Sequence, residues 1–186
     1  WRLEFPLQPI RRHIQREVAD YQRVVRVAAV YRRHHPGVPA EDDPTMALLR
    51  VLMEESIEQI FRLLMLLYRP EDIHLIYEQV RSPDLYVRAD AIELLDNLID
   101  PAMRAVVFPI LDEDRFLSSI DEESDVDREP ALAYRFLQDA IWDHNCWLSV
   151  TTLCAVGRLR LASMRPELER AQQHAEPMVS SAAKVA

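Results

Sequence analysis

Residues 69–111 read RPEDIHLIYEQVRSPDLYVRADAIELLDNLIDPAMRAVVFPIL, and this stretch decides the fold. Its apolar residues recur every three or four positions, which is typical of amphipathic helices. A proline stands at or near each expected start, where its missing N–H costs no hydrogen bond, and Ser82 and Asp100 stand where N-terminal caps belong. The stretch therefore predicts three short helices, at 71–81, 83–99 and 101–111.

Helices this short cannot each bury an apolar face alone, so they must stack on their neighbours. Short helices that stack on one another are typical of a helical repeat array. We therefore expect an all-α fold, a right-handed α-solenoid of roughly four antiparallel helix pairs. We divide the chain into residues 1–43, a basic amphipathic helix and a loop, and residues 44–186, the helical repeats.

The amino-terminal helix is expected over residues 7–35, where apolar residues recur at helical spacing. Residues 1–35 carry eight arginines against three acidic residues. These arginines either form a solvated face or make a basic surface that lies near anionic lipid or docks on an acidic partner. The candidate contacts on this surface are Arg12, Arg16, Arg23 and Arg26.

A second helix is expected from Pro44 to about Tyr68, and helices resume after Pro130. Between them lies the acidic stretch 112–129, DEDRFLSSIDEESDVDRE, most of which we expect to form a loop. Eighteen residues is long for a loop in a compact domain, so we expect it to move or to bind something.

Composition excludes several classes of protein. The chain has 186 residues, 49% of them hydrophobic, and only two glycines, too few for glycine-rich phosphate loops. Its net charge of −9 argues against nucleic acid as the main partner. The two cysteines cannot build a disulfide framework, which favours a reducing, cytoplasmic compartment. No signal peptide or membrane span is visible, and the start at Trp1 suggests a piece of a longer protein.

Three segments align without gaps: YVRADAIELL at 86–95, WLSVTTLCAV at 147–156 and MVSSAA at 178–183. The offsets between their starts are 61 and 31 residues, so one irregular unit, containing the acidic stretch, fits between the first two. A period near 30–40 residues is typical of a helical solenoid.

The segment PDLYVRADA at 83–91 resembles the start of the second helix in a HEAT repeat, where Asp, Val, Arg and Ala recur at this spacing. The unit at 147–156 departs from that pattern, with Ser149 in place of Arg and Thr152 in place of Ala. Residues 57–99 also resemble the soluble helical-repeat segment of some bacterial membrane proteins related to ATP/ADP translocases. This resemblance implies a position on the cytosolic face of a membrane, where basic residues are enriched.

The sequence contains few residues that could form a catalytic or metal site. His144, Cys146 and Cys154 invite a metal site, but a structural zinc site needs about four converging ligands, so we expect neither metal nor cofactor. No arrangement of Cys with His indicates a nucleophile, and we do not expect an enzyme. Trp142 and Trp147 are expected to pack in the core between units; the alternative is that they are exposed binding hot spots.

These observations favour a non-catalytic protein-interaction or scaffold domain, a cytosolic regulatory segment of a larger, transporter-like bacterial membrane protein. Its partner would be another protein or another domain of the same chain, with a membrane surface as a further contact for the basic helix. The alternative is a helical domain that senses a small ligand or nucleotide. An enzyme is the least favoured hypothesis.

Overall fold

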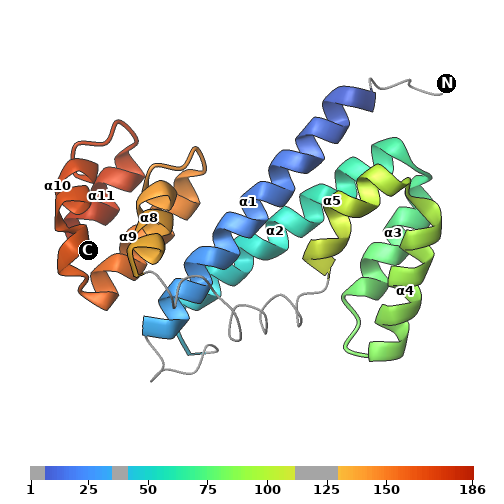
Figure 1. Ribbon diagram of the computed structural model, residues 1–186, viewed down its shortest axis with the longest axis horizontal. Coiled ribbons are helices and arrows are strands. Elements are labelled where there is room, and N and C mark those ends of the chain that lie inside the picture. The colour runs from blue at the N-terminus through green and yellow to red at the C-terminus, as the bar shows by residue number, and fades with distance from the viewer. Residues whose placement is uncertain (1–6, 35–41, 112–129) are drawn as a thin grey trace. The chain divides into compact units, whose positions relative to one another are not determined.

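A computed structural model describes residues 7–34, 42–111 and 130–186, and over these ranges every regular element is helical (Figure 1). No strand occurs in these ranges, so the prediction of an all-α fold is confirmed. The acidic stretch 112–129 lies outside the described residues. The elements are α1 (Leu7–His34), α2 (Pro44–Leu67), α3 (Pro70–Val80), α4 (Leu85–Leu98), α5 (Pro101–Leu111), α8 (Pro130–Ile141), α9 (Cys146–Leu159), the 3₁₀ turn η1 (Ala162–Met164), α10 (Arg165–Ala171) and α11 (Pro177–Val185).

Proline marks most helix starts, as the sequence predicts. It is the first residue of α2, α3, α5, α8 and α11 and the second residue of α10. At these positions the missing N–H would have had no helical partner, and the fixed φ angle suits the helix. Asp100 caps α5 as expected, since its Oδ1 accepts hydrogen bonds from the N–H groups of Ala102 at 3.1 Å and Met103 at 3.2 Å.

The predicted cap at Ser82 is wrong. Helix α4 begins at Leu85, so the residue before it, Asp84, is the cap and accepts a hydrogen bond from the N–H of Tyr86 at 2.8 Å. Ser82 instead supports the turn, because its Oγ accepts a hydrogen bond from the N–H of Asp84 at 3.2 Å. The helix starts two residues later than expected, and the capping role moves with it.

The chain forms two compact units. One contains residues 1–22 and 54–116, and the other contains residues 23–53 and 117–186. This division differs from the sequence-based division at residue 43, because α1 and α2 each contribute residues to both units. A continuous helix gives no sequence signal where its packing partners change, so such a boundary is not visible from composition.

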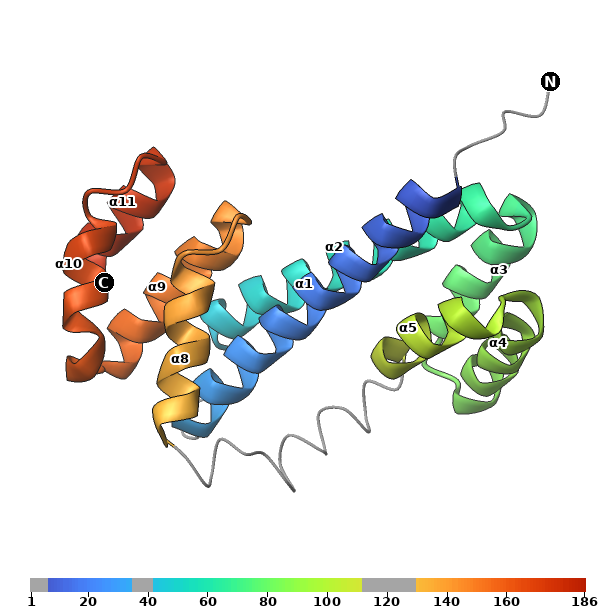
Figure 2. The same cartoon turned by 45° about the horizontal axis from the view of Figure 1, so that its top comes forward.

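In the first unit, α3 packs against α4 as a hairpin, and the two helices lie side by side in both views (Figures 1 and 2). The ring centroids of Phe61 and Tyr77 lie 5.2 Å apart with the rings tilted, a favourable geometry for two aromatic side chains. The core of this unit contains Ile14, Val18, Tyr21, Ile60, Phe61, Leu64, Ile73, Ile76, Ala91, Leu95, Met103 and Val107.

In the second unit, α8 packs on α9, α9 on α11, and α10 on α8 and α11. Ser180 Oγ donates a hydrogen bond to the carbonyl oxygen of Gln172 at 2.8 Å and so joins α11 to the end of α10. The core of this unit contains Val24, Val25, Val27, Tyr31, Leu49, Leu137, Ile141, Leu148, Leu153, Val156, Met164 and Val179.

Candidate interaction surface

Large apolar side chains point into solvent at one repeated position. Tyr86, Trp147 and Met178, the first residues of the three aligned segments, are the second residues of α4, α9 and α11. Their exposed fractions are 84%, 50% and 39%. Exposed apolar residues are ordinary when scattered, but here they recur at the same position of three helices, one in the first unit and two in the second.

The same alignment also has a buried position. Its sixth residue is Ala91 in α4, Thr152 in α9 and Ala183 in α11, and all three are buried. Small side chains at these points let a neighbouring helix approach closely. Thr152 satisfies its buried hydroxyl by donating to the carbonyl oxygen of Leu148 at 2.7 Å, which explains how Thr is tolerated where the other two units carry Ala.

The expectation that Trp142 and Trp147 pack in the core is wrong, because both are exposed. Trp147, the second residue of α9, is 50% exposed, whereas the next residue, Leu148, is buried. Trp142 follows the last residue of α8 and is 39% exposed. Hydropathy alone cannot tell an inward from an outward position when the helix start is known only to within a residue or two.

Trp142 fastens the end of α8 to α10. Its Nε1–H donates to Glu167 Oε2 at 2.8 Å. The guanidinium of Arg170 lies over the indole ring, 4.9 Å from its centroid, and the ring of His174 lies 5.7 Å away. A cation over an aromatic face and a satisfied indole N–H hold this tryptophan in place. Among the described residues, Trp147 has neither a hydrogen bond from its indole N–H nor a guanidinium over its ring, so it is the better candidate for a binding contact.

The four candidate arginines of α1 have different surroundings. Arg12 and Arg16 are exposed. Arg23 is half-buried, and its Nε lies 2.7 Å from Oδ2 of Asp143, whose side chain is only 6% exposed. The guanidinium of Arg26 lies 5.1 Å from the centroid of the Phe136 ring. The sequence pattern could not show this division, since Asp143 and Phe136 are more than 100 residues away along the chain.

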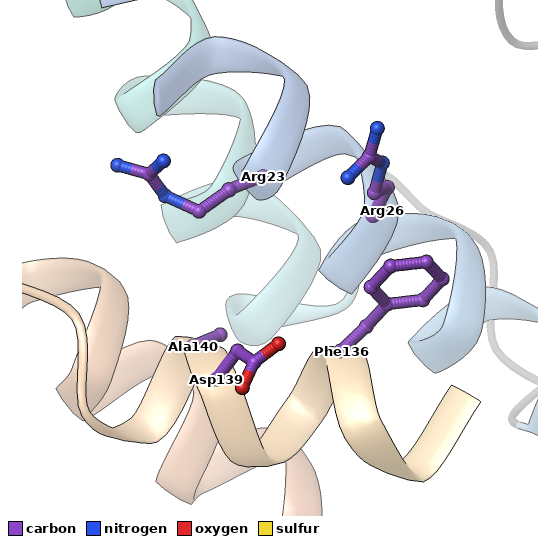
Figure 3. Close-up of a pocket in the computed structure, with 5 residues that line it drawn as sticks. All are labelled: Arg23, Arg26, Phe136, Asp139 and Ala140. Atoms are coloured by element: carbon purple, nitrogen blue, oxygen red, sulfur yellow. The ribbon is translucent and has the colours of Figure 1, made fainter. Parts of the chain in front are cut away.

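A hollow of about 90 Å³ lies between α1 and α8. In Figure 3 Arg26 stands above the Phe136 ring, and the guanidinium groups of Arg23 and Arg26 point in different directions. Pockets that bury small organic ligands usually measure about 300–1,000 Å³, so this hollow is too small for a nucleotide. Its lining residues are Arg23, Arg26, Phe136, Asp139 and Ala140.

A buried carboxylate holds the start of α2. Asp43, 2% exposed, accepts hydrogen bonds from the Tyr31 hydroxyl at 2.8 Å, the Thr45 N–H at 2.8 Å and Arg158 Nη1 at 2.8 Å. Burial alone would raise the pKa of Asp43, but the hydrogen bonds and the charge of Arg158 outweigh it and lower that pKa. Burial, together with the bond to Asp43, raises the pKa of Tyr31. This cluster joins α1, α2 and α9 and is structural.

A second carboxylate holds the start of α5. Asp100 Oδ2 accepts hydrogen bonds from the Tyr68 hydroxyl at 2.6 Å and from Arg11 Nη2 at 2.7 Å. These bonds hold the pKa of Asp100 well below its ordinary value of 3.8. Carboxyl groups with shifted pKa values often mark active sites. Here the hydrogen-bond donors to Asp100 are Tyr68, Arg11 and the first N–H groups of α5, which link helices to one another. Asp100 therefore fastens α1 and the end of α2 to α5.

The residues considered for a metal site do not converge. Cys146 and Cys154 are free thiols on α9, and His144 Nδ1 lies 3.0 Å from Oδ1 of Asp143. In the part of the chain that the structure describes, no three His, Cys, Asp or Glu side chains are grouped so that they could hold a metal ion. The same part contains no helix that is both long enough and apolar enough to cross a membrane.

No family model matches the chain, and neither a curated protein nor a solved structure matches it. Tyr86 and Met178 were not among the contacts predicted from the sequence, although both begin aligned segments. The signal that would have found them is the shared first position, where Tyr, Trp and Met are all large and apolar.

Proposed function

We propose that this chain is a non-catalytic protein-interaction domain built from stacked, HEAT-like helix pairs that form a right-handed α-solenoid. The helix pairs that support this are α3 with α4 in the first unit, and α8 with α9 and α10 with α11 in the second. Each pair packs as a hairpin, and the aligned segments fall at the same point of the second helix in each. In such an array each helix pair packs against its neighbours, and its outer face remains available to bind a partner.

The contact between α9 and α11 supports this arrangement. A Cβ placed on Gly157, near the end of α9, would lie 2.7 Å from the Cα of Ala186, which follows α11. The second helices of two successive pairs therefore meet at their carboxyl ends, as they do when helices stack in parallel. Repeat arrays stack equivalent helices in this way.

One observation carries the interaction role: Tyr86, Trp147 and Met178 are exposed at one equivalent position of three helices. Tyrosine and tryptophan are enriched at the energetic centres of protein interfaces, because they combine large apolar area with a polar group. A surface selected only for solubility would carry charged residues there.

A photo-crosslinking amino acid at these positions tests the role in cells of the source organism. Benzoylphenylalanine replaces Tyr86, Trp147 or Met178, and Gln59, an exposed polar residue of α2, is the matched control. We expect a covalent adduct with a protein at the first three positions and none at position 59. Equal labelling at all four positions, or none, would overturn the proposal.

In the wider version of the proposal, the domain is a cytosolic regulatory segment of a larger transporter-like bacterial membrane protein. Arg12 and Arg16 support it, because both are exposed and neither has an ion-pair partner among the described residues. Juxtamembrane basic residues bind anionic lipid with about 1 kcal/mol each near the surface. Co-sedimentation with anionic vesicles should weaken in the double variant Arg12→Gln with Arg16→Gln; unchanged binding would exclude this lipid contact.

The alternative function is sensing of a small ligand by the hollow at Arg26 and Phe136. Its volume of about 90 Å³ fits an inorganic anion or a short carboxylate better than a nucleotide. A ligand of the folded state must raise thermal stability. A thermal-shift screen with phosphate, acetate and ATP therefore decides the matter, with Arg26→Gln as the variant that should abolish any shift.

A further inference from the structure

The outer surface of the α3–α4 hairpin is unusually apolar. Leu75 on α3 is 51% exposed, and on α4 the exposed fractions are 84% for Tyr86 and 44% for Leu94, two residues that lie on the same side of the helix. We call these three residues the hairpin surface. Each of them would gain free energy by leaving water, at about 25 cal/mol per Å² of apolar area buried.

Carboxylates surround these apolar side chains on the same helix faces. Glu71 and Glu78 precede and follow Leu75 by four and three residues, so they lie beside it on α3. On α4, Asp90 stands four residues from both Tyr86 and Leu94, and Glu93 stands seven residues, about two turns, after Tyr86. All four carboxylates are exposed, and none has a side-chain partner in the described part of the chain.

The hairpin as a whole is acidic. Residues 70–98 contain seven Asp and Glu residues and two arginines. Both arginines are engaged locally: Arg81 Nη1 donates to the Tyr77 hydroxyl, and Arg88 Nη2 lies 3.5 Å from the carbonyl oxygen of Ser82. Arg69 and Arg104, just outside this range, pair with Asp72 and Asp96, and the five other carboxylates still outnumber the two arginines. The field outside the hairpin surface is therefore negative, which repels anionic lipid and nucleic acid and attracts cations.

We propose that the hairpin surface binds a basic amphipathic helix of a protein partner. Its apolar face would cover Leu75, Tyr86 and Leu94, and its flanking Lys and Arg side chains would pair with Glu71, Glu78, Asp90 and Glu93. Helices commonly dock on helical domains through apolar anchors spaced along one face, and opposite charges at the rim fix orientation and speed association. This inference rests on the proposed interaction role and names the partner's chemistry.

Fluorescence anisotropy with labelled peptides tests it on the full 186-residue chain. The probe is a designed helix of about 18 residues, five turns long, with Leu along one face and Lys on the other. One control peptide has the same composition in an order without a helical apolar face, and another has Glu in place of Lys. We expect saturable binding of the basic amphipathic helix only.

Paired variants separate the two contributions. Tyr86→Ser with Leu94→Ser should weaken binding about tenfold, because truncation of exposed anchors at an interface commonly costs that much. Asp90→Asn with Glu93→Gln should weaken binding and flatten its dependence on salt. The matched control, Glu54→Gln with Glu55→Gln, removes the same charge from exposed residues of α2 and should leave binding within about twofold of the unchanged chain.

Circular dichroism and thermal melting first establish that each variant is folded. Equal binding of the ordered and reordered basic peptides would overturn the inference, because charge alone would then explain it. So would an equal loss of binding in the two charge variants. If no peptide binds while crosslinking at position 86 still captures a protein, the partner's chemistry is wrong and the interaction role stands; if crosslinking also fails, both are wrong.

Discussion

Asp43 and Arg158 are 115 residues apart in sequence, yet Arg158 Nη1 lies 2.8 Å from Asp43 Oδ1. Asp43 is 2% exposed, whereas the side chain of Arg158 is 44% exposed. The carboxylate also accepts hydrogen bonds from Tyr31 and Thr45, so it bonds to residues of α1, α2 and α9. The two residues therefore contribute unequally. The buried carboxylate of Asp43 holds the three helices together, and the exposed guanidinium of Arg158 adds one of its hydrogen bonds.

Asp43→Ala should lower the free energy of unfolding by about 2–4 kcal/mol, because it removes a helix cap and the buried carboxylate that accepts the hydrogen bond of the Tyr31 hydroxyl. Arg158→Ala should cost about 1 kcal/mol or less, because its partner keeps other donors and solvent screens the exposed guanidinium. Urea denaturation at neutral pH measures both. Equal costs for the two variants would show that the carboxylate contributes no more than the guanidinium.

Asp100 should make stability depend on pH in the acid range. Its pKa lies below 3.8 in the folded chain, so the folded state binds fewer protons than the unfolded state when the pH falls through that region. The stability that Asp100 contributes is complete above about pH 5 and is lost progressively as the pH falls below that value. Urea midpoints measured at successive pH values should fall less steeply in Asp100→Asn than in the unchanged chain, and parallel curves would contradict this.

Gly157→Ala should destabilise the second unit although alanine is the better helix former. The added Cβ would stand 2.7 Å from the Cα and 2.9 Å from the carbonyl oxygen of Ala186, which forces the backbone to shift. Overpacking of this kind costs about 1–3 kcal/mol, against a gain of up to about 1 kcal/mol in helix propensity. Removing Ala186 from the variant should restore the stability lost; a persistent loss would place the clash elsewhere.

Adjacent residues of α9 should behave oppositely. Trp147→Ser should change the free energy of unfolding by about 1 kcal/mol or less, because half of the side chain is already in water. Leu148→Ala should cost about 2–5 kcal/mol, because Leu148 is 1% exposed and its truncation leaves a cavity. Thermal and urea unfolding of both variants test the register, and a larger cost for Trp147→Ser would show that it belongs to the core.

The helices could be predicted closely from sequence because their starts carry local chemistry. Proline at the first position and Asp100 as a cap act within one turn, so a single sequence reveals them. The cap of α4 was placed two residues early, at Ser82 instead of Asp84, because both side chains are able to cap and only the chain's path decides between them.

The candidate surface was less accessible to prediction. Trp142 and Trp147 were expected in the core because large apolar residues usually lie there, and only packing shows that they face outward. Arg23 was grouped with the basic surface because Asp143, its partner, lies far along the chain. Such pairings depend on the order in which helices stack, which local propensity does not encode.

Photo-crosslinking from position 86, compared with position 59, tests the interaction role most directly. Tyr86 is 84% exposed, so the replacement preserves an aromatic side chain without disturbing the fold. We predict a protein adduct from position 86 that is absent from position 59. Absence of any adduct at position 86, or equal labelling at both positions, would contradict the account.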